Sequence, residues 1–156
     1  MRRRAAFIAL LNHGGNELLC VHHTYSLKSS QKQAAKDTQQ NPHGKWGIPG
    51  GYVNKDETDF DAAKREFAEE TGAAFPLDDI ETMYEIYPNS EQTDVVVFVC
   101  RLVANAKKMK SVGTPRQNWK GNPEIDECKW MTKKNIGETG SVRPIFIDYY
   151  DMLFIV

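Results

Sequence analysis

The chain has 156 residues, a formal net charge of −1, and a composition that is 40% hydrophobic and 26% charged. This length and apolar content predict one folded domain over residues 1–156 rather than a disordered tail. The near-neutral charge excludes the basic footprint of a non-specific nucleic-acid binder, so any phosphate contact must be local.

The N-terminal segments favour β-structure. Residues 5–12 and 16–23 are β-leaning runs on either side of His13-Gly14-Gly15-Asn16, which predicts a hairpin. Three arginines and a short apolar run resemble the start of a secretory signal, but no small-residue cleavage site follows. We therefore expect a first strand. No apolar run approaches the roughly 18 residues of a membrane span, so we expect no membrane partner.

Residues 26–44 are rich in Lys, Gln, Ser and Asn and contain almost no apolar residue. Such a segment does not pack a core, so it predicts a long surface loop, with room for a short helix near residues 31–36.

The second half of the chain contains strand-like runs at residues 80–87, 93–103 and 125–131, and then an apolar stretch over residues 145–156. Pro144 is suited to open a helix in that last stretch. Hairpin strands around one strong central helix predict an α/β fold of the α+β type, with a mixed sheet flanked by helices.

Three cysteines, Cys20, Cys100 and Cys128, lie in apolar runs without a CxxC pair. An odd number of such residues suits buried thiols in a reducing cytoplasm better than a disulfide framework. We therefore expect a cytoplasmic protein with no zinc site.

The central helix has clear limits. Thr58 followed by Asp61 resembles a capping box, and Gly72 supplies a C-terminal stop, so a helix is predicted between them. One apolar stripe is available for burial and comprises Phe60, Ala63 and Phe67.

Glu66, Glu69 and Glu70 occupy positions i, i+3 and i+4 near the end of this helix. Like charges at that spacing repel, and the helix macrodipole is negative there, at a cost of a few tenths of a kcal/mol for each effect. A hard divalent cation would reverse both penalties, because Mg²⁺ and Mn²⁺ prefer oxygen ligands. The structural alternative is a solvated acidic face in which Arg65 pairs with Glu69.

The residues before the helix complete a longer motif. Lys45-Trp46-Gly47-Ile48-Pro49-Gly50-Gly51 permits close backbone approach, and from Gly51 the order is five residues, Glu57, seven residues, then Arg65-Glu66-Phe67-Ala68-Glu69-Glu70-Thr71-Gly72-Ala73. This order resembles the Nudix box at every fixed position. Ala73 alone departs from the pattern, because it is smaller than the aliphatic residue usual there.

The resemblance implies an α/β/α sandwich with a mixed sheet, and Mg²⁺- or Mn²⁺-dependent hydrolysis of nucleoside diphosphates linked to a further moiety. It implies metal ligation by the carboxylates of Glu66, Glu69 and Glu70 and by the Gly51 carbonyl. Glu57 and Arg65 resemble the pair that braces the loop against the helix, and Gly50 and Gly51 allow the substrate to approach the backbone closely.

A general base is also expected. Glu124 and Glu127 both precede Trp130, and the position of Glu124 resembles that of a late glutamate that binds metal or acts as base in some family members. We favour Glu124 over Glu127, with Glu66 as the remaining candidate.

The substrate is less constrained by the sequence. Pro88, 15 positions past Ala73, resembles a proline of ADP-ribose hydrolases in the family and favours ADP-ribose or an NDP-sugar. Residues 105–123 carry five cations and Trp119, a composition suited either to phosphate and base binding or to a plain solvated loop.

Other functions stay open. The same box would serve a nucleoside triphosphate pyrophosphohydrolase or an enzyme acting on RNA 5′ ends, the only nucleic-acid partner we expect. A non-catalytic nucleotide-sensing module is the alternative of another class, although the intact Glu66, Glu69 and Glu70 argue against it. The sequence leaves the oligomeric state open, with a homodimer among the options.

Overall fold

A computed structural model describes residues 2–23, 44–90, 93–106, 125–140, 142 and 151–154. The strands are β1 Arg3–Leu11, β2 Leu18–His23, β3 Trp46–Gly47, β4 Gly50–Tyr52, β5 Ile80–Ile86, β6 Thr93–Leu102 and β7 Ile125–Met131. The helices are α2 Asp59–Thr71, the short 3-10 helix η1 Leu77–Asp79 and α3 Lys133–Thr139. Residues 151–153 are also helical.

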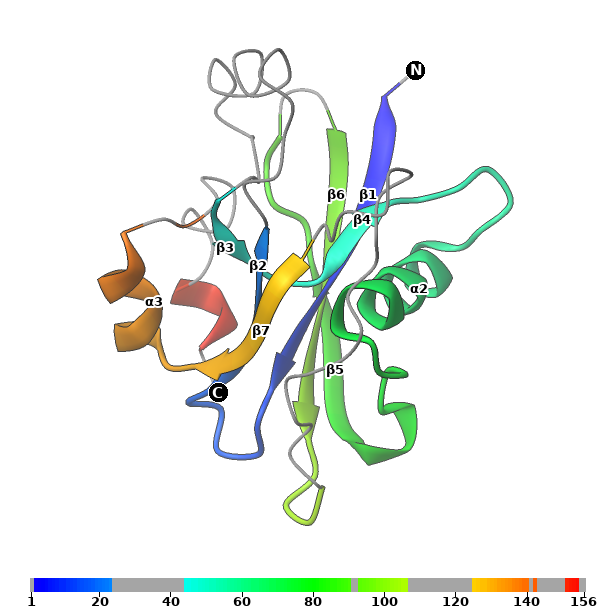
Figure 1. Ribbon diagram of the computed structural model, residues 1–156. Helices are drawn as coiled ribbons and strands as arrows, with labels where there is room; N and C mark the ends of the chain where they lie inside the picture. The colour runs from blue at the N-terminus through cyan, green and yellow to red at the C-terminus, as the bar shows by residue number, and fades with distance from the viewer. Residues whose placement is uncertain are drawn as a thin grey trace.

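All seven strands join one mixed sheet (Figure 1). β1 runs parallel to β6 along its whole length, whereas the other pairings are antiparallel. β1 is buried on both faces from Ala5 onward, which explains its unbroken apolar run. The prediction of a mixed sheet flanked by helices is confirmed.

The expected hairpin of β1 and β2 forms only next to its turn. Leu11 and Leu18 are the one registered pair between these strands, and Gly15 turns the chain with a φ of 72°. Beyond this pair, β2 continues beside β3 and β7, whereas β4 takes the place next to β1. The sheet therefore forks, and residues 46–52 cross from one branch to the other.

Two apolar clusters cover the two faces of the sheet. Ala62, Ala63 and Phe67 of α2 pack on one face, and Ile136 of α3 and Leu153 pack on the other. Figure 1 shows α2 and α3 on opposite sides of the strands. Fully burying a side chain such as Phe67 contributes about 1.5–3 kcal/mol, so α2 is fixed by its apolar stripe.

Helix α3 is absent from the sequence-based expectations. Only Ile136 of this helix is buried, so the helix has no apolar stripe from which it could be predicted. Its signal is a capping box, in which the Thr132 side chain accepts from the Asn135 N–H at 3.1 Å and the Asn135 side chain accepts from the Thr132 N–H at 3.1 Å.

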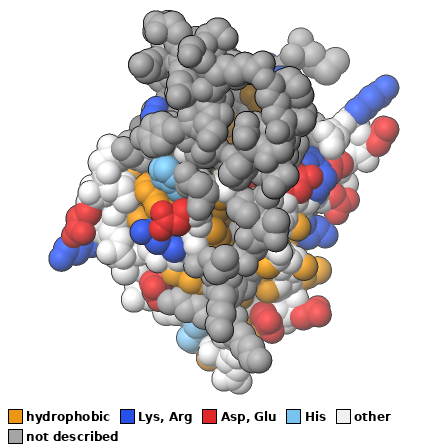
Figure 2. All heavy atoms as spheres, in the orientation of Figure 1, with side chains coloured by type: hydrophobic (Ala, Val, Ile, Leu, Met, Phe, Trp, Pro, Cys, Tyr) orange, Lys and Arg blue, Asp and Glu red, His pale blue; other side chains and the backbone are white. Residues whose placement is uncertain are grey.

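Several expectations fall outside the described residues. These are the loop over residues 26–43 with its helix near 31–36, Pro144 and most of the stretch 145–156. In the part of the chain that is described, no helix combines the length and the apolar character needed to cross a bilayer. Figure 2 shows charged side chains of both signs interspersed on the described surface of one face.

Candidate functional site

The limits of α2 follow from its caps. The Thr58 hydroxyl accepts a hydrogen bond from the Asp61 N–H at 3.1 Å, and Gly72 ends the helix with a φ of 75°. Its N–H donates to the Ala68 carbonyl at 2.9 Å. The predicted helix between Thr58 and Gly72 is therefore confirmed, and it holds the three glutamates at fixed spacing.

Two of these glutamates are buried. Glu66 is 8% exposed and Glu70 is 5% exposed, whereas Glu69 is intermediate. A solvated acidic face would leave all three in water, so the burial argues against that alternative. Burying a carboxylate costs free energy unless the group is paired, hydrogen-bonded or bound to a metal. Buried carboxylates are therefore common at functional sites.

Glu70 reaches the outer edge of β4, where its Oε1 accepts from the Gly50 N–H at 2.7 Å. Burial first, and the charge of the Glu70 carboxylate second, raise the pKa of the Cys128 thiol on β7 to about 12. Burial also raises the pKa of the thiols of Cys20 and Cys100. The three cysteines are free and buried as expected, and such thiols are poor nucleophiles and metal ligands.

Gly50 and Gly51 are required for two different close approaches. A Cβ on Gly50 would lie 2.3 Å from Phe7 Cδ1 and 2.5 Å from the Ala6 carbonyl oxygen. A Cβ on Gly51 would lie 2.7 Å from Cδ of Glu66 and 2.8 Å from its Oε1. The missing side chain of Gly51 therefore makes the space that the Glu66 carboxylate occupies.

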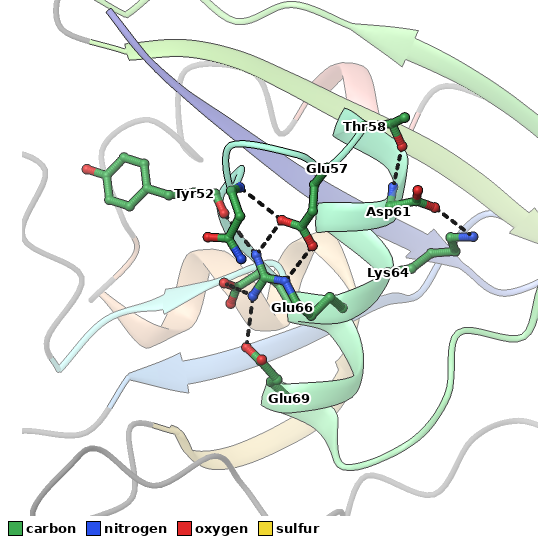
Figure 3. A network of polar contacts seen from close by, with 9 residues as sticks. Tyr52, Glu57, Thr58, Asp61, Lys64, Glu66 and Glu69 are labelled. Atoms are coloured by element: carbon green, nitrogen blue, oxygen red, sulfur yellow. Dashed lines mark hydrogen bonds and ion pairs between the residues drawn. The ribbon is translucent and has the colours of Figure 1, made fainter.

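Arg65 connects two glutamates of α2 to Glu57 in the preceding loop, and Figure 3 shows these glutamates around one network of polar contacts. Its Nε and Nη2 donate to both carboxylate oxygens of Glu57, at 2.7 and 2.9 Å. Its Nη1 donates to Glu66 at 2.9 Å and to Glu69 at 3.3 Å, and Nη2 also donates to the Tyr52 carbonyl at 3.1 Å. One guanidinium thus fixes the loop, the helix and β4 together.

Glu57 is held as an anion. The Arg65 guanidinium, with help from the Asn54 N–H at 2.9 Å, lowers the pKa of the Glu57 carboxyl to about 2. The carboxylates of Glu57 and Glu66 in turn raise the pKa of the Arg65 guanidinium. Glu57 and Arg65 therefore have the geometry expected of a brace between loop and helix.

The pH dependence of stability should report this brace. A pKa lowered from 4.5 to about 2 stabilises the fold fully above pH 4.5, and the contribution is lost as the pH falls toward 2. We expect wild type to exceed Glu57→Gln in urea midpoint at pH 6, with the difference shrinking between pH 4.5 and 2. Asp56→Asn, which removes an exposed carboxylate from the same loop, is the control. A difference that stays constant down to pH 2 would contradict the brace.

The backbone register bears on the expected glycine ligand. The Val53 N–H donates to the Arg4 carbonyl, and the Ile8 N–H donates to the Pro49 carbonyl. Hydrogen-bonded pairs alternate along an antiparallel ladder, so the N–H and the carbonyl of Gly51, which is paired with Ala6, both point toward β1. The N–H of Gly50 and its carbonyl then face the outer edge, where the N–H meets Glu70. This register argues against the predicted Gly51 carbonyl as a metal ligand and favours that of Gly50.

The carboxylate oxygens of Glu66, Glu69 and Glu70 suit a hard cation, but these oxygens do not converge on one point in this structure. Among the described residues, no three His, Cys, Asp or Glu side chains converge on a ready-made metal position. Glu66 and Glu69 bind Arg65, and Glu70 binds the Gly50 N–H. Cation binding at the predicted set would therefore exchange some of these contacts for metal–oxygen bonds.

The late candidates for the general base separate. Glu127 pairs with Lys129 at 3.5 Å, and the Lys129 Nζ lies 4.9 Å from the centroid of the Trp46 ring. Trp46 belongs to the cluster on the sheet face away from α2, so Glu127 faces away from the α2 glutamates. Glu124 and Trp119 lie outside the described residues, as do residues 107–123 of the basic loop.

Comparisons with known proteins show the family to which this chain belongs. The NUDIX domain family model matches residues 1–149. The chain therefore belongs to the Nudix family and is an enzyme that acts on pyrophosphate bonds. Divalent-metal dependence and small nucleotide substrates are general features of the family. No curated protein matches the chain.

Solved structures share the fold at low identity. The Nudix hydrolase RenU from M. smegmatis is 19% identical with a TM-score of 0.64, over 97% of this chain and 83% of that one. A bifunctional NMN adenylyltransferase/ADP ribose pyrophosphatase from Francisella tularensis is 17% identical with a TM-score of 0.58, over 98% and 41%. A C. elegans Ap4A hydrolase is 17% identical with a TM-score of 0.53, over 96% and 98%.

Proposed function

We propose that the protein hydrolyses the pyrophosphate linkage of a nucleoside diphosphate joined to another moiety, with Mg²⁺ or Mn²⁺, and that ADP-ribose or an NDP-sugar is the first candidate substrate. The observation that carries the proposal is the burial of Glu66 and Glu70 against Gly51 and Gly50 of β4. A divalent cation would compensate these two charges, and its remaining coordination positions would accept oxygens of a diphosphate.

In this proposal the cation is held by Glu66, Glu69 and Glu70 together with the Gly50 carbonyl. When bound, such a cation neutralises the diphosphate and lowers the pKa of a coordinated water. Arg65 keeps the glutamates oriented, and Glu57 keeps Arg65 in place, which is the role of residues that act on metal ligands from outside. Hydrolysis would form a bond from the water oxygen to one phosphorus and break the bond from that phosphorus to the bridging oxygen. The second phosphate would leave with the bridging oxygen, and the general base would take the proton of the water.

Support for the substrate comes from Pro88. Its position, 15 residues past Ala73, resembles that of a proline of ADP-ribose hydrolases in the family. The similarity to an ADP ribose pyrophosphatase supports the same substrate, and the similarity to an Ap4A hydrolase supports a dinucleoside polyphosphate equally well.

A hydrolysis screen tests the proposal. Purified protein with Mg²⁺ is assayed on ADP-ribose, NDP-sugars, dinucleoside polyphosphates, nucleoside triphosphates and 5′-triphosphate RNA. The expected products are a nucleoside monophosphate and a phosphorylated remainder from one of the first two groups. Cleavage of nucleoside triphosphates alone, or of RNA 5′ ends alone, would refute the substrate and leave the reaction class standing.

The general base is tested by comparing Glu124→Gln, Glu127→Gln and Glu66→Gln. We propose Glu124 as the base on its place in the chain, and the direction of Glu127 supports the choice. The base variant should lose kcat with little change in KM and should lose the acidic limb of the pH profile. Glu127→Gln should keep near-normal kcat. Loss of turnover in Glu127→Gln with normal turnover in Glu124→Gln would reverse the assignment.

A further inference from the structure

The three arginines at the start of the chain have different surroundings. Arg2 binds the Asp94 carboxylate at 2.7 Å, and Arg4 binds that of Asp59. Arg3 has no acidic partner among the described residues, and its guanidinium carbon instead lies 3.3 Å from the centroid of the Tyr52 ring. Arg3 is therefore an exposed cation held against an exposed aromatic ring.

This pair lies beside the proposed site. Tyr52 follows Gly51 directly, and its carbonyl accepts from Arg65 at 3.1 Å. Because side chains alternate along β4, the Tyr52 ring is on the strand face opposite the Gly51 and Glu66 contact. Figure 3 shows the ring pointing away from α2. Tyr52 is 46% exposed, whereas Gly50 and Gly51 beside it on β4 are only partly exposed.

The edge of β4 joins the two faces. Among the described strands β4 pairs only with β1, and its outer edge carries the Gly50 N–H and the Tyr52 carbonyl that α2 side chains bind. A nucleotide whose diphosphate is bound through a cation at Glu66 and Glu70 would have to pass this edge to bring its other end to the Tyr52 face.

We propose that Arg3 and Tyr52 form a stacking platform for the nucleobase of the substrate, an inference that rests on the proposed function for the nucleotide character of that substrate. The guanidinium is planar and weakly hydrated, and it stacks on aromatic surfaces. Carboxylates bind Arg2 and Arg4, whereas the guanidinium of Arg3 lies on the Tyr52 ring. The guanidinium and the ring together form a planar surface suited to stacking with a base, and no carboxylate in the described part of the chain directs the Arg3 N–H groups toward a bidentate contact with a phosphate.

Calorimetric titration with AMP, GMP, CMP and UMP, and with ribose 5-phosphate as the ligand that lacks a base, tests the platform in Mg²⁺ buffer. Tyr52→Ala removes the ring, Tyr52→Phe keeps it, and Arg3→Ala removes the stacked cation. Arg2→Ala is the charge-matched control, because it removes an arginine one residue away whose partner is Asp94. Melting temperatures of all variants separate lost binding from lost folding.

The wild type should bind at least one nucleoside monophosphate more tightly than ribose 5-phosphate. Tyr52→Ala should weaken that binding about tenfold or more, as for other base–aromatic stacks, and leave ribose 5-phosphate binding unchanged. Arg3→Ala should weaken it severalfold, whereas Tyr52→Phe and Arg2→Ala should not. Equal losses for both ligands would show a phosphate contact and overturn the platform, as would equal losses in Arg2→Ala or no preference for a base.

Activity separates this inference from the function on which it rests. In the hydrolysis screen, Tyr52→Ala should raise KM for the accepted substrate while kcat is largely kept. Turnover with an unchanged KM would contradict the platform alone. Absence of turnover on every substrate would contradict the proposed function, whereas the monophosphate titrations would still decide the platform.

Discussion

Replacing Glu70 or Glu69 with glutamine is expected to lower kcat at least about a hundredfold, because each change deletes an anionic ligand of the proposed cation. Glu70→Gln is the sharper test of the two. Glutamine keeps an oxygen that accepts from the Gly50 N–H, so the edge of β4 remains held while the charge is lost. The melting temperature in metal-free buffer should therefore change little or rise, since repulsion from Glu66 is relieved.

The matched control is Glu138→Gln on α3, where an exposed glutamate pairs with Lys134 at 3.8 Å. This variant should keep full kcat. A marked drop in the melting temperature of metal-free Glu70→Gln, with kcat intact, would assign the buried carboxylate to folding instead of catalysis.

Adding a methyl group at the two glycines is expected to cause two different failures. Gly50→Ala places a Cβ 2.5 Å from the Ala6 carbonyl oxygen, which belongs to the backbone of β1 and does not yield without breaking strand pairing. A loss of stability of about 3 kcal/mol is expected, at the upper end of ordinary overpacking. Gly51→Ala instead meets the end of the Glu66 side chain, so this variant should fold and lose activity.

Urea unfolding and steady-state kinetics on both variants separate these outcomes. Gly137→Ala serves as control, since a Cβ there meets nothing within 4 Å and alanine favours a helix over glycine by about 1 kcal/mol. Equal stability losses at Gly50 and Gly51, or full activity in Gly51→Ala, would contradict the assigned contacts.

The site was more predictable than the sheet topology for a physical reason. Helix α2 is specified by neighbours in sequence, with Thr58 and Gly72 as caps and Phe67 as its anchor, so spacing alone placed the glutamates. The burial of Glu66 was not predictable from helix periodicity, because it depends on Gly51 arriving from β4. The same is true of the bond between Glu70 and Gly50.

The sheet depends on pairings between distant residues. β1 and β2 look like a hairpin in sequence, yet their pairing ends at Leu11 and Leu18 because the glycine-containing strand β4 fits beside β1 at Ala5 to Phe7. The register that turns the Gly50 carbonyl outward and the Gly51 carbonyl inward follows from this pairing. Helix α3 could not be predicted from an apolar stripe, because Ile136 is its one buried residue.

Hydrolysis of a nucleotide pyrophosphate by this protein is proposed to require a divalent cation held by the α2 glutamates. The most direct test is turnover of the accepted substrate by one protein preparation in EDTA, and again after Mg²⁺ or Mn²⁺ is restored. We expect no turnover in EDTA and full recovery with either cation. In Glu70→Gln at the same cation concentration, turnover should recover to about one hundredth of the wild-type rate or less. Undiminished turnover in EDTA would contradict this requirement.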